Sequence, residues 1–298
     1  MGIEWRGMRL LIIVLLIIVL VLLVTALALG REDWRLLMSS RNTISIDQQD
    51  RTYRLYNESS EEQRPLVVAL HGLRDRATWL GVYSGFHFLA DEQDFTLALP
   101  NGKNNSWNAD FCCGRSFIDG TQDTEFILAM IDEISDIYAI DSDQVFVVGF
   151  SNGGALAQKL LHEAPTTFAG GAAVMSGVGS NSSELDISNA KDPLMLINGD
   201  NDQYVPVEKR SQGDDFSFLP AFESGEKWAS QLKADEVNYV KEDLYDAYIW
   251  GDGRLLQQRI YHDQSHRWPQ WRLWTFPDEV PDSTRDIWQF WQDSSVAS

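Results

Sequence analysis

The pentapeptide Gly149-Phe150-Ser151-Asn152-Gly153 decides the fold that this sequence predicts. Residues 144–148, directly before it, have the apolar character of a β-strand, and residues 155–161, directly after it, favour a helix. A strand-to-helix turn this tight strains the serine backbone and lifts the hydroxyl clear of the sheet. Side chains at the first and last positions would collide with the turned chain, so both require glycine. The following helix also directs its N-terminus at the serine, where it favours negative charge.

Short apolar runs alternate with helical patterns on both sides of this turn. The expected strands are residues 51–56, 66–70, 96–99, 145–148, 172–175 and 194–197, and the expected helices are residues 86–92, 123–138 and a last one starting near Ser283. Apolar runs without alternation, separated by helices, are typical of a parallel sheet covered on both faces. The sequence therefore predicts an α/β architecture.

The serine needs a base, and the base needs a group that orients it. In folds with this turn, the acid and then the base follow the serine, at the ends of later strands. The run 194–199 leads into Asp200 and Asp202, and either aspartate fits the acid. His262 and His266 are the histidines beyond them. We expect His266 to be the base, because it lies in a loop, whereas His262 continues a strand.

An oxyanion hole needs two backbone N–H groups beside the serine. The residue after the nucleophile, Asn152, supplies one of them. The other is expected from the loop after an early strand, where Gly72 lets the backbone turn its amides toward the site. Leu73 is the expected donor, although the sequence does not distinguish it from Arg74. His71, next to this glycine, is interpreted as a structural histidine that fixes the loop.

Composition limits the partners and cofactors. The 298 residues carry a formal net charge of −20, and such an acidic surface repels phosphate, so nucleic acid is not expected as a partner. The five histidines and two cysteines form no paired ligand motif, so neither a metal nor another cofactor is expected. The cysteines are neighbours, Cys112 and Cys113, and either a disulfide or two reduced thiols fits the sequence.

The N-terminal residues 1–30 differ from the rest of the chain. Residues 8–29 are almost continuously apolar, and about 20 such residues cross a bilayer, whereas the core of a cleaved signal has about 7–15. Arg6 and Arg9 favour a cytoplasmic N-terminus. We expect a membrane anchor with an extracytoplasmic catalytic domain, the alternative being secretion after cleavage near residues 26–28.

The motifs together resemble the polyhydroxybutyrate depolymerase-like and feruloyl/acetylxylan esterase group, carbohydrate esterase family 1 of the α/β-hydrolase superfamily. The matching stretches run from about residue 50 to residue 292 and are Leu70-His71-Gly72, Pro100-Asn101-Gly102, Trp107-Asn108, Cys112-Cys113, residues 149–154, Asp202 with Val205-Pro206, and His266 with Trp268-Pro269. The resemblance implies the α/β-hydrolase fold, here preceded by one N-terminal transmembrane helix. The expected organisation is thus an anchor or uncleaved signal at 1–30, a spacer at 31–49 and the catalytic domain at 50–298.

Carried over residue by residue, the resemblance selects Asp202 as the acid, because Val-Pro follows it at the family's spacing, and His266 as the base. The sequence departs from the family at Ser265, where glycine is common, and at Asp123, which commonly has a second aspartate beside it. Both departures leave the shape of the pocket open.

The sequence therefore predicts a serine esterase with Ser151 as nucleophile, acting on small or polymeric esters. Trp107 and Trp268 are expected to line the acyl or sugar pocket. Acyl transfer to a sugar or lipid alcohol is an alternative, since the same triad serves both reactions. A non-catalytic binding module displayed on a membrane is another. The identity of the ester and the oligomeric state are not readable from the sequence.

Overall fold

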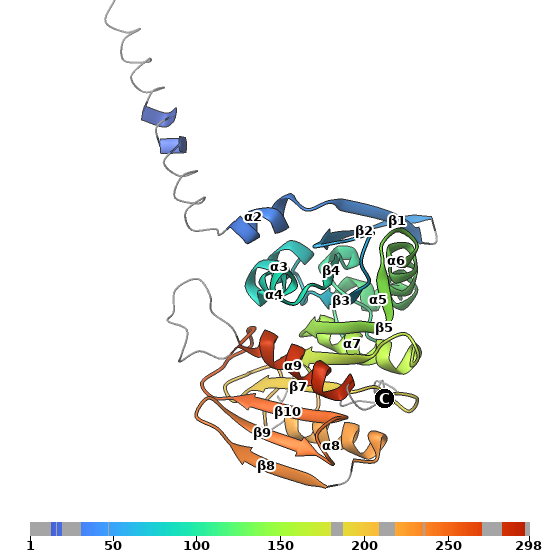
Figure 1. The fold of residues 1–298 in the computed structure, drawn as a ribbon. Helices are drawn as coiled ribbons and strands as arrows, with labels where there is room; N and C mark the ends of the chain where they lie inside the picture. The colour runs from blue at the N-terminus through green and yellow to red at the C-terminus, as the bar shows by residue number, and fades with distance from the viewer. Residues whose placement is uncertain are drawn as a thin grey trace, which may run out of the picture.

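A single ten-stranded sheet organises the protein (Figure 1). The computed structural model describes residues 13–15, 17–19, 31–46, 48–179, 187–208, 218–234, 236–269 and 282–295. The strands, in their order across the sheet, are β1 (Arg41–Ile46), β2 (Gln49–Tyr56), β4 (Thr96–Pro100), β3 (Arg64–Leu70), β5 (Ile140–Phe150), β6 (Gly170–Val174), β7 (Leu194–Gly199), β10 (Leu256–Tyr261), β9 (Tyr245–Trp250) and β8 (Val237–Lys241). Strands β4 to β10 in this order are parallel, and the two outer strands on each side are antiparallel.

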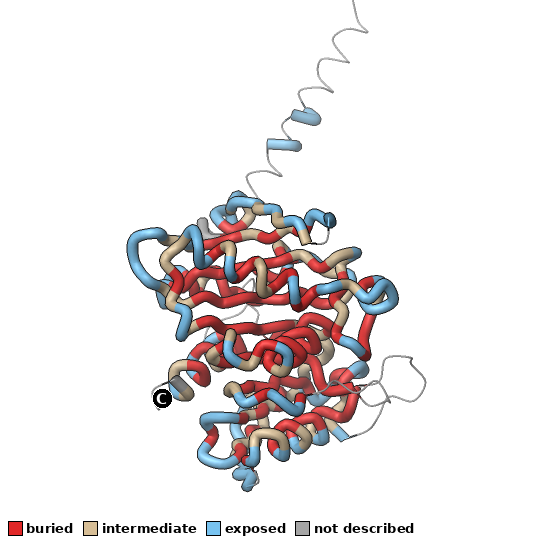
Figure 2. Tube along the Cα trace, turned by 90° about the vertical axis from the view of Figure 1, so that its right-hand side faces the viewer, coloured by how far each residue is buried: buried red, intermediate tan, exposed pale blue. Residues whose placement is uncertain are grey.

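Helices cover both faces of the sheet. One face carries α6 (Asp123–Ile137), α7 (Asn152–Glu163) and α8 (Ala221–Leu232), and the other carries α2 (Arg31–Met38), α3 (Ala77–Ser84), α4 (Phe86–Gln93) and α9 (Ser283–Ser295). The central strands lie between these layers and are buried over most of their length (Figure 2). The mostly parallel, doubly covered sheet predicted from the sequence is therefore confirmed.

The continuous apolar runs follow from this arrangement. In β3, Leu66 and Val68 enter the hydrophobic core on one face, while Val67 and Ala69 enter the core on the other. All four side chains have no exposed surface. A strand that is buried on both faces has no position left for a polar side chain, which is why its sequence does not alternate.

The prediction that residues 31–49 form a spacer needs correction, because this stretch is part of the domain. They form α2 and β1, and β1 pairs with β2 in antiparallel register from Arg41 opposite Arg54 to Ile46 opposite Gln49. Leu36 on α2 is completely buried in the core. The strand was missed because it lies at the edge of the sheet, where solvent-facing polar side chains alternate with partly buried ones.

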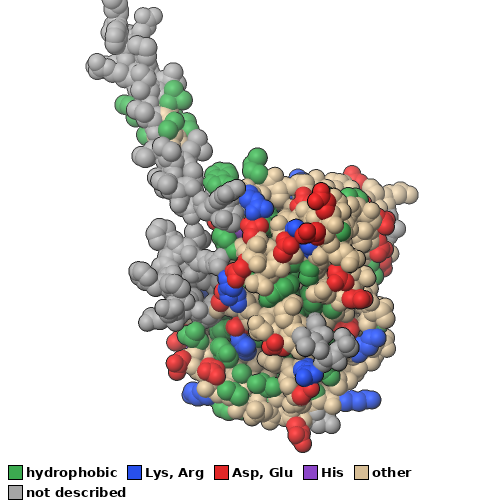
Figure 3. All heavy atoms as spheres, in the orientation of Figure 1, with side chains coloured by type: hydrophobic (Ala, Val, Ile, Leu, Met, Phe, Trp, Pro, Cys, Tyr) green, Lys and Arg blue, Asp and Glu red, His purple; other side chains and the backbone are tan. Residues whose placement is uncertain are grey.

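The membrane anchor expected at residues 1–30 lies outside the described residues, except for 13–15 and 17–19, which are helical and exposed. Among the residues that are described, none of the helices combines the length and the apolar character needed to span a bilayer. On the face shown in Figure 3, acidic side chains are scattered among basic and hydrophobic ones. The net charge is therefore not gathered into one patch on that face.

Candidate active site

Ser151 lies on the sharp turn between β5 and α7. Its backbone adopts φ 52° and ψ −116°, a region that residues other than glycine rarely occupy. The Ser151 N–H donates to Val174 O on the neighbouring strand at 2.8 Å, and α7 begins at the next residue. The turn therefore holds the serine hydroxyl at the end of the sheet, in front of a helix N-terminus.

The glycines on either side of the serine are required by space. A Cβ atom at Gly149 would lie 2.0 Å from Gly153 O, and one at Gly153 would lie 2.3 Å from Leu70 O. Both obstacles are backbone atoms, which cannot rotate away as a side chain can. The turn can close this tightly at Gly149, and pass this close to β3 at Gly153, only because both positions lack a side chain.

Ser151, His266 and Asp202 form a continuous line of hydrogen bonds. His266 Nε2 lies 2.8 Å from Ser151 Oγ, and His266 Nδ1 lies 2.8 Å from Asp202 Oδ2. An ionised carboxylate only accepts hydrogen bonds, so Nδ1 carries the proton and Nε2 accepts from the serine hydroxyl. The second oxygen, Oδ1, accepts the backbone N–H groups of Tyr204 at 2.8 Å and Val205 at 3.0 Å. The buried aspartate is thus fully hydrogen-bonded.

The three side chains come from the carboxyl ends of parallel strands. Ser151 follows β5, Asp202 follows β7 and His266 follows β10, and these strands lie in the order β5-β6-β7-β10. Loops at the same edge of a parallel sheet meet there, which is where open α/β sheets place their sites. The order of the strands thus brings the serine and the histidine together across a sequence separation of 115 residues.

The other sequence candidates lie elsewhere. Asp200 is exposed, and the structure brings Asp202 rather than Asp200 to the histidine. His262 has its Nδ1 3.2 Å from Asp243 O and its Nε2 3.5 Å from Asp246. It therefore takes part in contacts away from the serine.

The loop after β3 lies beside the serine turn, and its hydrogen bonds distinguish the two possible oxyanion donors. Arg74 donates its N–H to Asn105 O at 2.7 Å, so this amide already has an acceptor. Leu73 is partly exposed and precedes it. Leu73 therefore remains the candidate donor from this loop, beside Asn152 from the serine turn.

Aromatic rings flank the imidazole of His266. The Tyr204 ring lies 4.8 Å from it and the Phe150 ring 5.2 Å from it, centroid to centroid. Phe150 in turn lies 6.0 Å from Tyr83 on α3. These aromatic neighbours were not identified from the sequence. Only their positions in the sequence could have indicated them, since Phe150 is inside the pentapeptide and Tyr204 comes two residues after Asp202.

Trp107 and Trp268 were expected to line the substrate pocket, but the rings of both are buried. Trp107 has no exposed surface, and its Nε1 donates to His71 O at 2.8 Å. Trp268 is 4% exposed, and its Nε1 donates to Thr284 Oγ1 at 3.1 Å. Its ring lies 6.3 Å from Phe150. The structure thus places Trp107 behind the β3 loop and Trp268 behind the aromatic ring next to the serine.

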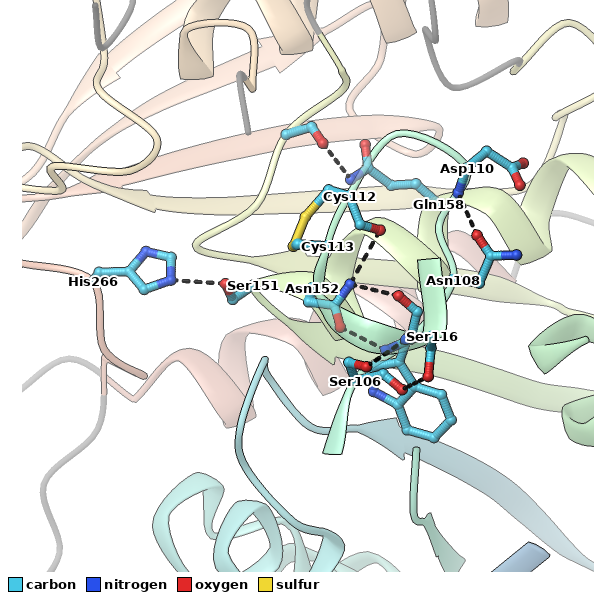
Figure 4. The surroundings of a disulfide bond; sticks show 12 residues. Ser106, Asn108, Asp110, Cys112, Cys113, Ser116, Ser151, Asn152, Gln158 and His266 are labelled. Atoms are coloured by element: carbon cyan, nitrogen blue, oxygen red, sulfur yellow. Dashed lines mark hydrogen bonds between the residues drawn. A yellow bond between two sulfur atoms is a disulfide. The ribbon is translucent and has the colours of Figure 1, made fainter. Parts of the chain in front are cut away.

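Cys112 and Cys113 are joined by a disulfide and are almost completely buried. Figure 4 shows this disulfide beside Asn152, with His266 pointing at Ser151 from the other side. The Asn152 side chain donates to Cys112 O at 3.4 Å. In the part of the chain that the structure describes, no cluster of three or more His, Cys, Asp or Glu side chains could hold a metal ion.

The chain is similar to known proteins over part of its length. A family model described as phospholipase/carboxylesterase matches residues 119–218. NocK of Nocardia uniformis subsp. tsuyamanensis, named as an inferred esterase, is 32% identical over 162 residues, 53% of this chain and 47% of NocK. The bifunctional acetylxylan esterase/xylanase XynS20E of Neocallimastix patriciarum is 26% identical over 191 residues, 63% of this chain and 26% of that protein. The chain thus spans less than half the length of these two relatives.

Among solved structures, an acetyl xylan esterase from Aspergillus awamori superposes with a TM-score of 0.61 and 16% identity, over 84% of this chain and 98% of that one. At this identity the likeness concerns the fold. Together with the family match, it shows that the chain has the α/β-hydrolase fold, which confirms that part of the predicted fold class.

Proposed function

We propose that this protein is a serine carboxylic-ester hydrolase that works through an acyl-enzyme intermediate. The observation that carries the proposal is the hydrogen-bonded line from Asp202 through His266 to Ser151, with the serine on a strained turn at a helix N-terminus. The similarity to esterases supports the same reaction.

The reaction begins when His266 Nε2 takes the proton of Ser151 and the serine oxygen attacks the ester carbonyl carbon. The N–H groups of Leu73 and Asn152 bind the oxygen that becomes negative. His266 then gives the proton to the departing alcohol, leaving the acyl group on the serine. A water molecule then gives a proton to His266 and attacks the acyl carbon in the same way, which releases the acid and restores the serine hydroxyl. Asp202 holds the imidazole in the required tautomer and stabilises its cationic form.

The proposed substrates are the esters of the polyhydroxybutyrate depolymerase-like and feruloyl/acetylxylan esterase group. The sequence motifs support this class, as does the similarity to a relative named for acetylxylan. Rates on acetylated xylan, a feruloylated oligosaccharide, hydroxybutyrate oligomers and p-nitrophenyl acetate, measured side by side, test it. A rate on every natural ester far below that on the simple ester would contradict the proposed class.

We also propose that residues 8–29 anchor the protein in a membrane, with the hydrolase domain on the extracytoplasmic side. Arg6 before this apolar run and Arg9 at its beginning support this placement. Fractionation of cells that make the full chain tests the proposal. We expect the intact chain in the membrane fraction, with its domain accessible to protease added outside. A shortened, soluble extracellular form would indicate signal cleavage instead.

The test of the activity is hydrolysis of p-nitrophenyl acetate and labelling by an active-site fluorophosphonate. We expect Ser151→Ala to abolish both. Ser142→Ala is the matched control, because this serine is exposed and lies at the far end of β5. Ester hydrolysis retained in purified Ser151→Ala contradicts the proposal. Product analysis with added sugar and lipid alcohols distinguishes hydrolysis from acyl transfer.

A further inference from the structure

The Asn152 side chain is bound to the backbone of Trp107 by a reciprocal pair of hydrogen bonds. Trp107 N donates to Asn152 Oδ1 at 2.7 Å, and Asn152 Nδ2 donates to Trp107 O at 2.9 Å. Asn152 has no exposed surface, so its side chain cannot contact a substrate. Figure 4 shows it pointing into the loop that carries Ser106 and Cys112. The residue that offers one oxyanion amide is thus held to this loop.

The indole of Trp107 reaches the loop that offers the other amide. Its Nε1 donates to His71 O at 2.8 Å, and the two rings lie 4.9 Å apart. Residue 107 therefore uses its backbone to hold Asn152 and its side chain to hold the residue two positions before Leu73.

The imidazole of His71 continues the chain of contacts. Gly102 N donates to His71 Nε2 at 2.9 Å, and since an amide N–H only donates, Nε2 is unprotonated. Nδ1 then carries the proton and donates to Gly72 O at 2.7 Å. Burial lowers the pKa of His71, which favours this neutral form.

The contact to Gly72 O matters because of peptide geometry. The Gly72 carbonyl and the Leu73 N–H belong to one planar peptide group, in which the two bonds point in opposite directions. Fixing the carbonyl against His71 therefore fixes the direction in which the Leu73 N–H points. An oxyanion hole depends on such fixed directions, since its donors contribute most when they need no rearrangement during the reaction.

We infer that Trp107 is a positioning residue that holds the two oxyanion donors, Leu73 and Asn152, in one rigid frame. The inference rests on the proposed esterase function. Trp107 touches neither substrate nor reacting atoms, since its side chain is completely buried. Its effect passes through Asn152 on one side and through His71 on the other.

The test is Trp107→Phe, which keeps an aromatic ring and removes the Nε1 donor. We expect kcat for p-nitrophenyl acetate to fall about tenfold with KM changed less than about twofold, because the lost contact acts on the transition state. Trp291→Phe is the matched control. Trp291 is also completely buried and donates its Nε1 to a backbone carbonyl, Gly171 O at 3.2 Å, but it lies on α9, away from the serine.

A readout specific to the oxyanion hole separates positioning from general stability. A trifluoromethyl ketone forms a tetrahedral oxyanion on the serine, so its Ki should rise in Trp107→Phe by about the factor by which kcat falls. Both variants are compared well below their melting temperatures. A kcat and Ki for Trp107→Phe equal to those of Trp291→Phe would overturn the inference.

A second variant covers the case in which Trp107→Phe does not fold. Asn152→Asp retains the backbone N–H at position 152 and the shape of the side chain, but loses the Nδ2 donor to Trp107 O. We expect the same paired change in kcat and Ki, and unchanged values would reject the inference. A wild-type protein that hydrolyses no ester and takes no fluorophosphonate label would instead refute the proposed function.

Discussion

His266 Nε2 and Ser151 Oγ lie 2.8 Å apart, and the tautomer that makes this contact productive is set on the other side of the ring by Asp202. The carboxylate is itself fixed by the two N–H groups that its Oδ1 accepts. The geometry of the serine contact thus depends on a residue that never touches the serine.

Asp202→Asn is therefore expected to reduce kcat by about 10⁴, because an amide at this position favours the wrong imidazole tautomer. Steady-state kinetics on a p-nitrophenyl ester measures the effect. Asp200→Asn is the control, since Asp200 is exposed, and should leave kcat unchanged. A large loss of kcat in Asp200→Asn with little loss in Asp202→Asn would mean that Asp200, and not Asp202, orients the histidine.

The Tyr204 ring contacts the imidazole of His266 in a T-shaped arrangement, while 59% of the residue remains exposed. Tyr204→Ala should lower kcat/KM several-fold, because the imidazole loses a packing partner while the residue 204 N–H bond to Asp202 remains. Tyr204→Phe should behave like the wild type. Equal losses in both variants would point to the hydroxyl rather than to the ring.

Arg51 and Asp123 form a buried ion pair, with Nη2 2.6 Å from Oδ1 and side-chain exposures of 5% and 0%. Burial raises the pKa of Asp123, and the Arg51 charge opposes this effect. Arg51→Met should lower the free energy of unfolding by roughly 3–5 kcal/mol, because it leaves a buried carboxylate without its counter-charge. Urea denaturation measures this loss.

The exposed pair Arg115 and Asp119 provides the comparison for that measurement. Arg115→Met removes a cation of the same kind from a solvent-accessible pair, and it should change the stability little. If the two arginine variants were equally stable, the buried pair would not be stabilising in the way described.

Asp192 makes the stability of the folded protein depend on pH. Burial raises its pKa from 3.8 to about 6, and its Oδ2 has no hydrogen-bond partner among the described residues. The folded protein holds this proton more tightly than the unfolded chain, so the group reduces stability as the pH rises from 3.8 to about 6, with no further loss above that.

Asp192→Asn removes this titration. The variant should melt at a higher temperature than the wild type at about pH 8, and the difference should shrink toward zero as the pH approaches the ordinary aspartate value. Thermal unfolding followed by circular dichroism at several pH values measures it. A difference that does not vary with pH would exclude Asp192 as the titrating group.

The parts of the fold that the sequence predicted are those in which local and tertiary preferences agree. Residues 145–148 and 194–197 are apolar throughout and buried on both faces of the sheet, so composition alone identified them. Strands β8 and β9 were not recognised. In β8, four of five residues are exposed, so its pairing with β9 rather than its own composition makes it a strand.

The three side chains that the structure brings together at the candidate site were predictable from the sequence, and the residues around them were less so. The position of His266 in a loop beyond the last parallel strand distinguished it from His262. The choice between Leu73 and Arg74 depended on Asn105, whose carbonyl takes the Arg74 N–H and which is distant in sequence. Residue type alone placed Trp107 in a pocket. It did not reveal that a backbone carbonyl would bind the indole in the interior.

The strained junction between β5 and α7 fixes Ser151, whereas Asp202 and His266 are carried by loops. The position of Ser151 is thus set by the backbone of the turn, whereas the positions of Asp202 and His266 depend on their loops. Insertions in the loops after β7 and β10 could reshape access to the hydroxyl without disturbing the backbone that presents it.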